Sequence, residues 1–234
     1  MFCSLIKKVN ISKSEKLTQI ATNKETNFIG IGGTNGFVQV ISLDVSKSKT
    51  SGKGGGQLSF TQALQYHTDD ITLMAWNDTF DKLTTCDKSG VIIVWKFIEG
   101  KWETEMINNR KQSYVTDLKW NRQGHYLCFI YEDGHAIVGT VDGNRSWGND
   151  IRNSLYLVEW SPDGNLLLLA SKNENIIILN SIGTQLGEVE IESNLKDIDL
   201  ASMTWWAKYI DDTKVITKKK TFNVSFCQWN YFII

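Results

Sequence analysis

A tryptophan that returns every 40 to 45 residues is the feature that most constrains this 234-residue chain. Trp76, Trp120 and Trp160 stand in similar β-prone stretches and lie 44 and 40 residues apart. Trp205 follows after 45 more residues, and Thr22 holds the equivalent place in a weaker first copy. A repeat of this length that contains several short β-prone runs is typical of a β-propeller blade. The tryptophan repeat therefore predicts an all-β fold built from such blades.

Glycines keep a second register inside each repeat. Gly36, Gly90 and Gly134 each stand fourteen residues after the position held by Thr22 or a tryptophan, between two β-prone runs. Asn-Gly and Asp-Gly pairs, which occur at two of these sites, favour hairpins because both residues tolerate a positive φ. An immunoglobulin-like sandwich, the competing architecture, predicts no such repeat. We expect about four blades plus a partial fifth, from an incomplete seven-bladed propeller.

The repeat also predicts where the tryptophans lie. Trp76, Trp120 and Trp160 occupy one place in successive repeats, so each should fill the space between neighbouring sheets. Large aromatic rings supply much of the packing energy at such contacts. We interpret these three residues as core residues rather than as ligand contacts.

Charge and cysteine usage exclude several classes of protein. The formal net charge is −1, from 25 basic and 26 acidic residues, which argues against electrostatic nucleic-acid binding. Cys3, Cys86, Cys128 and Cys227 form no CxxC pair and show no zinc spacing. The start is too short for a signal-peptide core, and no run is long enough for a transmembrane segment. We expect a reduced, soluble, cytosolic chain.

Two segments interrupt the repeat. Residues 46–56 are rich in glycine, lysine and serine, which predicts a flexible loop within the blade region 1–206. Residues 207–234 have no hairpin glycine and no register with the earlier copies. We interpret this divergent tail either as a closing strand or as an aberrant terminus.

Catalytic and metal-binding motifs are lacking in the sequence. There is no GxSxG, HExxH or phosphate-binding loop, so we expect neither an enzyme nor a cofactor. His125 and His135 flank one hairpin and could meet across it, but two histidines without a third ligand are a weak metal site. His67 stands where WD repeats carry the histidine of a Gly-His pair, with Tyr66 in place of the glycine. We expect His67 to be structural.

Several segments carry a family resemblance. They are Lys82–Thr85, Gly90–Trp95, Glu105–Arg110, Tyr131–Gly134 with Ile137–Gly139, and Val141–Gly148, of which the Val-Asp-Gly-Asn-Arg string is the most specific. Together they resemble the intraflagellar transport protein 121 family, also called WD repeat-containing protein 35. The resemblance runs from Met1 to about Trp206 and covers the N-terminal WD-repeat part.

The resemblance implies a function without catalysis. Members are subunits of the intraflagellar transport A (IFT-A) complex, which acts in retrograde ciliary transport, in cilium assembly and in delivery of membrane proteins to cilia. It implies as partners the other subunits of the complex and ciliary membrane cargo or adaptors. The implied location is the ciliary base, the axoneme and the cytoplasm. A generic WD-repeat adaptor, or a coat-like membrane-trafficking scaffold unrelated to cilia, would fit the repeat alone.

Loops between blades supply the candidate interaction residues. Asn109 with Arg110, and Asn144 with Arg145, stand in segments that carry the resemblance. Arginine is favoured at interfaces because its planar guanidinium pairs with carboxylates through two hydrogen bonds. Either these arginines contribute to a docking surface, or they tie blades together internally. The sequence favours neither reading.

Overall fold

The computed structural model describes residues 15–44, 57–110, 113–172, 175–190, 200–206 and 221–226. Every regular element among these residues is a β-strand. The expected flexible loop at 46–56 lies outside these ranges, and so does most of the expected tail at 207–234. The chain divides into two compact units, Met1–Tyr114 and Val115–Ile234.

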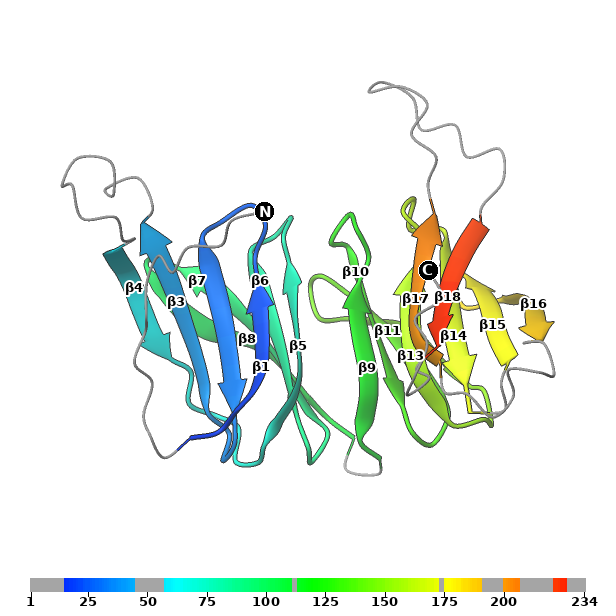
Figure 1. Ribbon diagram of the computed structural model, residues 1–234, viewed down its shortest axis with the longest axis horizontal. Coiled ribbons are helices and arrows are strands. Elements are labelled where there is room, and N and C mark those ends of the chain that lie inside the picture. Colours follow the sequence, from blue (N-terminus) through cyan, green and yellow to red (C-terminus); the bar gives the residue numbers. More distant parts are fainter. Residues whose placement is uncertain are drawn as a thin grey trace, which may run out of the picture. The chain divides into compact units, whose positions relative to one another are not determined.

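The first unit contains two four-stranded antiparallel sheets whose strands follow chain order. The first sheet consists of β1 (Leu17–Thr22), β2 (Phe28–Gly33), β3 (Val38–Asp44) and β4 (Gln57–Ala63). The second consists of β5 (Ile71–Asn77), β6 (Lys82–Asp87), β7 (Val91–Ile98) and β8 (Lys101–Asn109). The first strands of the two sheets are neighbours, since the Thr18 hydroxyl donates to the Ile71 carbonyl at 2.6 Å (Figure 1).

The second unit repeats this arrangement. One sheet consists of β9 (Val115–Trp120), β10 (Tyr126–Tyr131), β11 (His135–Thr140) and β12 (Arg145–Asp150). The next consists of β13 (Leu155–Trp160), β14 (Leu166–Ser171), β15 (Asn175–Asn180) and β16 (Gln185–Glu190). A two-stranded sheet follows, formed by β17 (Leu200–Trp206) and β18 (Thr221–Phe226).

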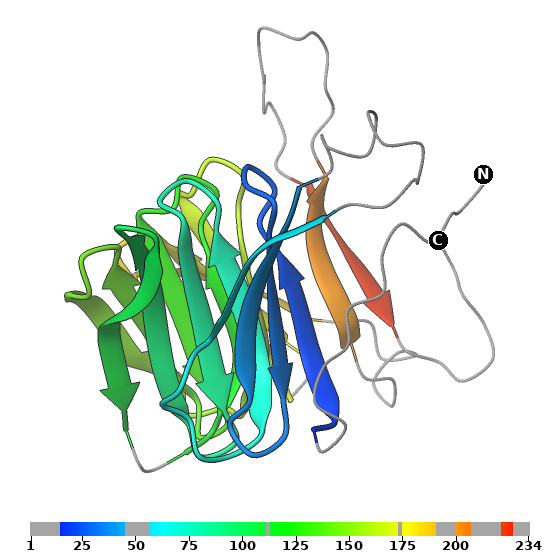
Figure 2. The same cartoon turned by 90° about the vertical axis from the view of Figure 1, so that its left-hand side faces the viewer.

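These sheets confirm the all-β repeat. Each of the four complete repeats forms one four-stranded antiparallel sheet. The two-stranded sheet of β17 and β18, orange and red in Figure 2, corresponds to the partial fifth. That the sheets belong to a seven-bladed ring stays a prediction. Among the described residues, no helix is long and apolar enough to cross a membrane.

The burial of each strand explains its composition. The second strands of the sheets, such as β6 and β14, are buried along nearly their whole length, so both faces contact protein. β14 is almost entirely apolar, whereas β6 also buries the polar side chains of Lys82, Thr84, Thr85 and Asp87. The fourth strands form the outer edges of the sheets. β16 is exposed at all but one of its positions and carries polar residues between its apolar ones.

Gly36 shows why glycine recurs in the hairpin between the second and third strands. Its φ is +72°, and a Cβ at this position would overlap the backbone carbonyl of His67. Gly90 and Gly134 share the positive φ and the close approach, to the carbonyls of Ser113 and Asn153 respectively. Each turn therefore needs its glycine for two reasons. The backbone has a positive φ, and the segment that leads into the next repeat lies too close for a Cβ.

Replacing Gly36 with alanine should therefore cost more stability than the same change in an open turn. Gly100 is the matched control, because its φ is +84° and nothing lies within 4 Å of a Cβ placed there. We expect Gly100→Ala to lower the unfolding free energy by about 1–2 kcal/mol and Gly36→Ala by about 2–4 kcal/mol. Chemical denaturation of both variants measures the difference, and equal losses would show that the contact with His67 contributes nothing.

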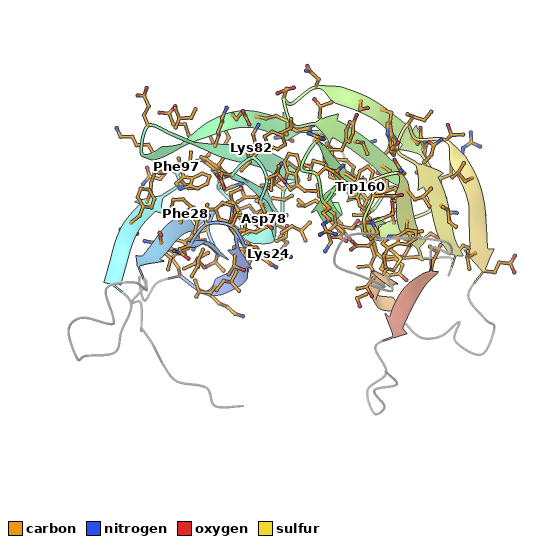
Figure 3. All side chains as sticks on the ribbon, turned by 90° about the horizontal axis from the view of Figure 1, so that it is seen from above. Lys24, Phe28, Asp78, Lys82, Phe97 and Trp160 are labelled. Atoms are coloured by element: carbon orange, nitrogen blue, oxygen red, sulfur yellow. The ribbon has the colours of Figure 1, made fainter. Side chains whose placement is uncertain are left out.

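Each unit has its own hydrophobic core between its sheets. In the first unit an aromatic cluster, made of Phe28, Phe60, Trp76, Phe97 and Trp102, fills the space between the two sheets. The rings of Phe28 and Phe97 lie 5.1 Å apart between centroids, and Figure 3 shows them close together on neighbouring sheets. The core of the second unit is mainly aliphatic and contains Trp160.

Candidate functional site

A chain of buried hydrogen bonds links four residues of the first unit. His67 Nδ1 lies 2.7 Å from Asp87 Oδ2, and His67 Nε2 lies 2.8 Å from Thr85 Oγ1. The indole Nε1 of Trp95 donates to the same Thr85 oxygen at 2.8 Å. His67 precedes β5, whereas the other three residues lie on β6 and β7. This series of hydrogen bonds therefore connects the loop that enters the second sheet to the two central strands of that sheet.

The proton positions in this network follow from its chemistry. The Trp95 indole nitrogen can only donate, so the Thr85 oxygen accepts from it and has its own hydrogen left to donate to His67 Nε2. His67 Nδ1 then carries the ring proton and donates it to the Asp87 carboxylate. Every group has a partner when the imidazole is neutral. Burial also lowers the pKa of His67, against the opposing hydrogen bond and charge of Asp87.

Asp87 also organises the hairpin turn that follows it. Its second oxygen accepts hydrogen bonds from the Ser89 backbone at 3.0 Å, the Ser89 hydroxyl at 2.6 Å and the Val91 backbone at 3.1 Å. The carboxylate therefore holds both the histidine and the turn that contains Gly90. One buried side chain connects the entry loop, the hairpin and the sheet.

The order carboxylate, imidazole and hydroxyl matches that of a hydrolase triad, so access decides its role. Thr85 is fully buried, and the side chains of His67 and Asp87 are 0% and 1% exposed. The Thr85 oxygen is also occupied by the Trp95 donor. A substrate cannot reach this hydroxyl in the folded chain, so we interpret the four residues as a structural hydrogen-bond network.

The lowered pKa of His67 makes the stability that this network contributes depend on pH. Below about pH 6.5 the unfolded chain protonates this histidine, whereas the folded chain keeps it neutral to a lower pH. The unfolded state then binds more protons, so the unfolding free energy falls as the pH falls through this window. We expect His67→Gln to be less stable than the wild type at neutral pH and to lose less stability between about pH 7 and pH 5. Denaturant titrations at both pH values test this, and an equal loss in the two proteins would contradict it.

Two contacts fasten the sheets of the first unit together at opposite edges. At the inner edge, Trp76 Nε1 donates to the Ala21 carbonyl at 2.9 Å. At the outer edge, the Gln62 side-chain amide accepts from the Trp102 backbone N–H and donates to the Trp102 carbonyl, both at 2.8 Å. The side-chain amide of Gln62 thus makes the two backbone hydrogen bonds with Trp102 that a neighbouring strand would otherwise make. Both sheets are fixed at their inner and outer edges, with the aromatic cluster between.

The second unit uses the same inner contact. Trp160, which is 4% exposed, donates from Nε1 to the Lys119 carbonyl at 3.0 Å. The Asp117 carboxylate adds a second link, since its Oδ2 accepts from the Val158 backbone N–H at 3.0 Å. Burial raises the pKa of Asp117, partly offset by its hydrogen bonds to backbone N–H groups. Trp120, at the end of β9, is only partly buried.

The outer contact of the second unit comes from β12. Trp147 Nε1 donates to the Ser181 carbonyl at 2.8 Å, and the Asn149 side-chain amide donates to the Gly183 carbonyl at 2.5 Å. The Trp147 ring lies against Gly183, where a Cβ would overlap it. These residues fix the turn between β15 and β16. Nothing in the sequence repeat singled out Asn149 or this use of Trp147.

The candidate interaction residues fall into two places. Asn109 ends β8 and is exposed, and Arg110 follows it half-buried. Arg145 begins β12 and Asn144 directly precedes it, and both are exposed. The guanidinium of Arg145 lies over Gly148 and makes no hydrogen bond or ion pair within the described part of the chain. Trp147 and Asn149 connect the two sheets here, and both readings of Arg145 stay predictions.

The structure shows where the two candidate metal ligands and two of the cysteines lie. His125 precedes β10 and His135 begins β11, so they stand at opposite ends of one hairpin, and the idea that they meet across it is wrong. Within the described ranges, no group of three or more His, Cys, Asp or Glu side chains could hold a metal. Cys86 and Cys128 are buried, and burial raises the pKa of the Cys86 thiol to about 12. Both behave as small core residues.

Comparison with known proteins shows the family to which this chain belongs. A sequence model of the WDR35/TULP4 N-terminal β-propeller matches residues 1–230, and this range includes most of the segment that the repeat leaves without register. The chain belongs to this family. Its similarity to human WD repeat-containing protein 35 is 37% identity over 213 residues, which is 88% of this chain and 18% of that protein.

A second relative matches the same family, and a solved structure matches the fold. Mouse Tubby-related protein 4 is 28% identical over 202 residues, which is 85% of this chain and 13% of that protein. The crystal structure of the C-terminal WD40 domain of Sif2 superposes with a TM-score of 0.64 at 18% identity, over 95% of this chain and 55% of that one. The chain is thus an all-β WD40 propeller chain that spans less than a fifth of the family relatives it matches.

Proposed function

We propose that the chain acts as a non-catalytic scaffold in the IFT-A complex. In this role it supports retrograde ciliary transport, cilium assembly and delivery of membrane proteins to cilia. Its partners are the other subunits of the complex and ciliary membrane cargo or adaptors. Its place is the ciliary base, the axoneme and the cytoplasm.

The similarity to WD repeat-containing protein 35 is the observation that carries this proposal. The architecture supports it, because sheets fastened at both edges hold exposed loops and turns in fixed positions. Rigid presentation of side chains lowers the entropy cost of binding a partner. The most triad-like group of residues, around His67, is buried and serves the fold.

Purification of the tagged chain from ciliated cells tests the proposal. We expect the other IFT-A subunits to be enriched over a tagged, unrelated WD40 propeller of similar size, and the tag to be found at the ciliary base. Quantitative mass spectrometry of the purified material measures the enrichment. A chain that is folded and expressed, yet enriches none of these subunits, would favour the generic adaptor instead.

A further inference from the structure

The turn between β2 and β3 contains the Asn-Gly pair of the sequence, Asn35-Gly36. An asparagine side chain can be converted to aspartate or isoaspartate without an enzyme, when the backbone nitrogen of the next residue attacks its amide carbon. Glycine at the next position favours this attack because it carries no side chain that would obstruct it. On sequence grounds, Asn35 is therefore the asparagine of this chain most open to the reaction.

The two reacting groups of this pair have no strong partner. Asn35 is exposed, and its side-chain amide makes one long hydrogen bond among the described residues, in which Nδ2 donates to Glu15 Oε2 at 3.4 Å. The backbone nitrogen of Gly36 donates no hydrogen bond to any residue that the structure describes. Neither the attacked amide nor the attacking nitrogen is therefore held back by a close hydrogen bond.

The backbone of the turn restrains the reaction. Asn35 has a φ of +57°, and its backbone N–H donates to Asp70 Oδ1 at 3.0 Å. This left-handed conformation directs the nitrogen of Gly36 away from the Asn35 side chain, so the backbone must rotate before the two can meet. Gly36 also lies against the His67 carbonyl, which limits such a rotation. The reaction therefore requires the turn to open, and the hydrogen bond to Asp70 opposes this opening.

We propose that Asn35 is a site of spontaneous deamidation that reacts from the open turn. The backbone nitrogen of Gly36 gives its proton to solvent and forms a bond to Cγ of Asn35. The bond from Cγ to the side-chain nitrogen breaks, and this nitrogen takes a proton from water and leaves as ammonia. Water then adds to either carbonyl of the cyclic imide and opens the ring. The product is an aspartate or an isoaspartate at position 35, and the inference does not depend on the proposed scaffold function.

The product cannot restore the contacts of this turn. A carboxylate in place of the amide loses the donor to Glu15 and brings a like charge to its Oε2. The Asp70 carboxylate, which accepts from the same residue's backbone, adds a further negative charge nearby. Isoaspartate also lengthens the backbone next to the tight contact between Gly36 and the His67 carbonyl. Deamidation therefore weakens the contact between the first two sheets, and the loss of ammonia makes the change irreversible.

Incubation of the purified chain at mildly alkaline pH, followed by peptide mapping with mass spectrometry, tests the proposal. We expect deamidation to accumulate at Asn35 before any other described asparagine. Asp70→Ala removes the acceptor for the Asn35 backbone N–H and should raise the rate at this position several-fold. Asp78→Ala is the matched control, because it removes a similar acceptor, for the Lys24 backbone N–H at 3.1 Å, from the turn at the other end of β2. This control should leave the rate at Asn35 unchanged.

Variants of Asn35 itself measure the consequence. Asn35→Asp reproduces the new charge and should lower the melting temperature by about 2–4 °C. Asn35→Gly tolerates the positive φ and has no amide to lose, so its melting temperature should stay constant during an incubation in which that of the wild type falls. If Asn35 stays unmodified while a free peptide of the same sequence deamidates, the proposal is wrong. Equal rates in the wild type and in Asp70→Ala would also overturn it, because the reaction would then not depend on opening of the turn.

Discussion

Replacing Asp87 with alanine is expected to lower the free energy of unfolding by about 3–5 kcal/mol. The change removes the acceptor for His67 Nδ1 and, at the same time, the acceptor for the Ser89 and Val91 backbone N–H groups. Buried donors without acceptors carry their full desolvation cost. For a chain of this size the loss corresponds to a fall in melting temperature of about 6–20 °C. Calorimetry or chemical denaturation measures it.

Asp87→Asn is the control for this prediction. Asparagine keeps the shape and can still accept from the turn, but its NH₂ group faces the His67 proton when its oxygen faces Ser89. We expect a smaller loss, about 1–3 kcal/mol. A loss below about 1 kcal/mol for the alanine variant would contradict the idea that Asp87 joins the entry loop to the hairpin.

Trp160→Ala is the second variant with a large expected effect. The ring is almost wholly buried between two sheets, and its Nε1 donates to the Lys119 carbonyl at 3.0 Å. Removal of a buried tryptophan side chain costs about 3–5 kcal/mol. Trp160→Phe should recover most of the packing but not the hydrogen bond, which is worth about 1 kcal/mol. Denaturant unfolding of both variants separates the two contributions.

Trp120 provides the internal comparison for Trp160. It holds the same repeat position, but it is only partly buried in the described structure. We expect Trp120→Ala to cost less than Trp160→Ala. If both variants lose the same stability, burial between sheets does not explain the effect of this repeat position.

The sheets and their turns could be predicted because their signals are local in sequence. A strand of six residues and a hairpin glycine lie within one stretch of the chain, and the repeat shows the same stretch several times. Gly36 illustrates this, since its Asn-Gly pair alone predicts the turn. Its close contact with the His67 carbonyl was not predictable, because it depends on how the next repeat approaches.

The contacts between distant side chains were largely missed. The sequence singled out His67, but its partners Thr85 and Trp95 were not recognised as a set. A WD-repeat histidine followed by a buried Thr-x-Asp and a tryptophan in the next strand was the available signal. The Gln62 contact with the Trp102 backbone left no signal, because a glutamine amide can pair with any exposed strand. The contacts of Trp147 and Asn149 with the turn between β15 and β16 also left no signal, because each joins residues 34 positions apart in the sequence.

Hydrogen exchange of the chain with and without the purified IFT-A subunits tests the central claim, that a rigid WD40 scaffold binds this complex, most directly. Backbone amides in the exposed loops and turns that the bound subunits cover should exchange more slowly in the mixture. Amides around the buried His67 network should be unchanged. Unaltered exchange along the entire chain, with the other subunits present in excess over it, would contradict the account.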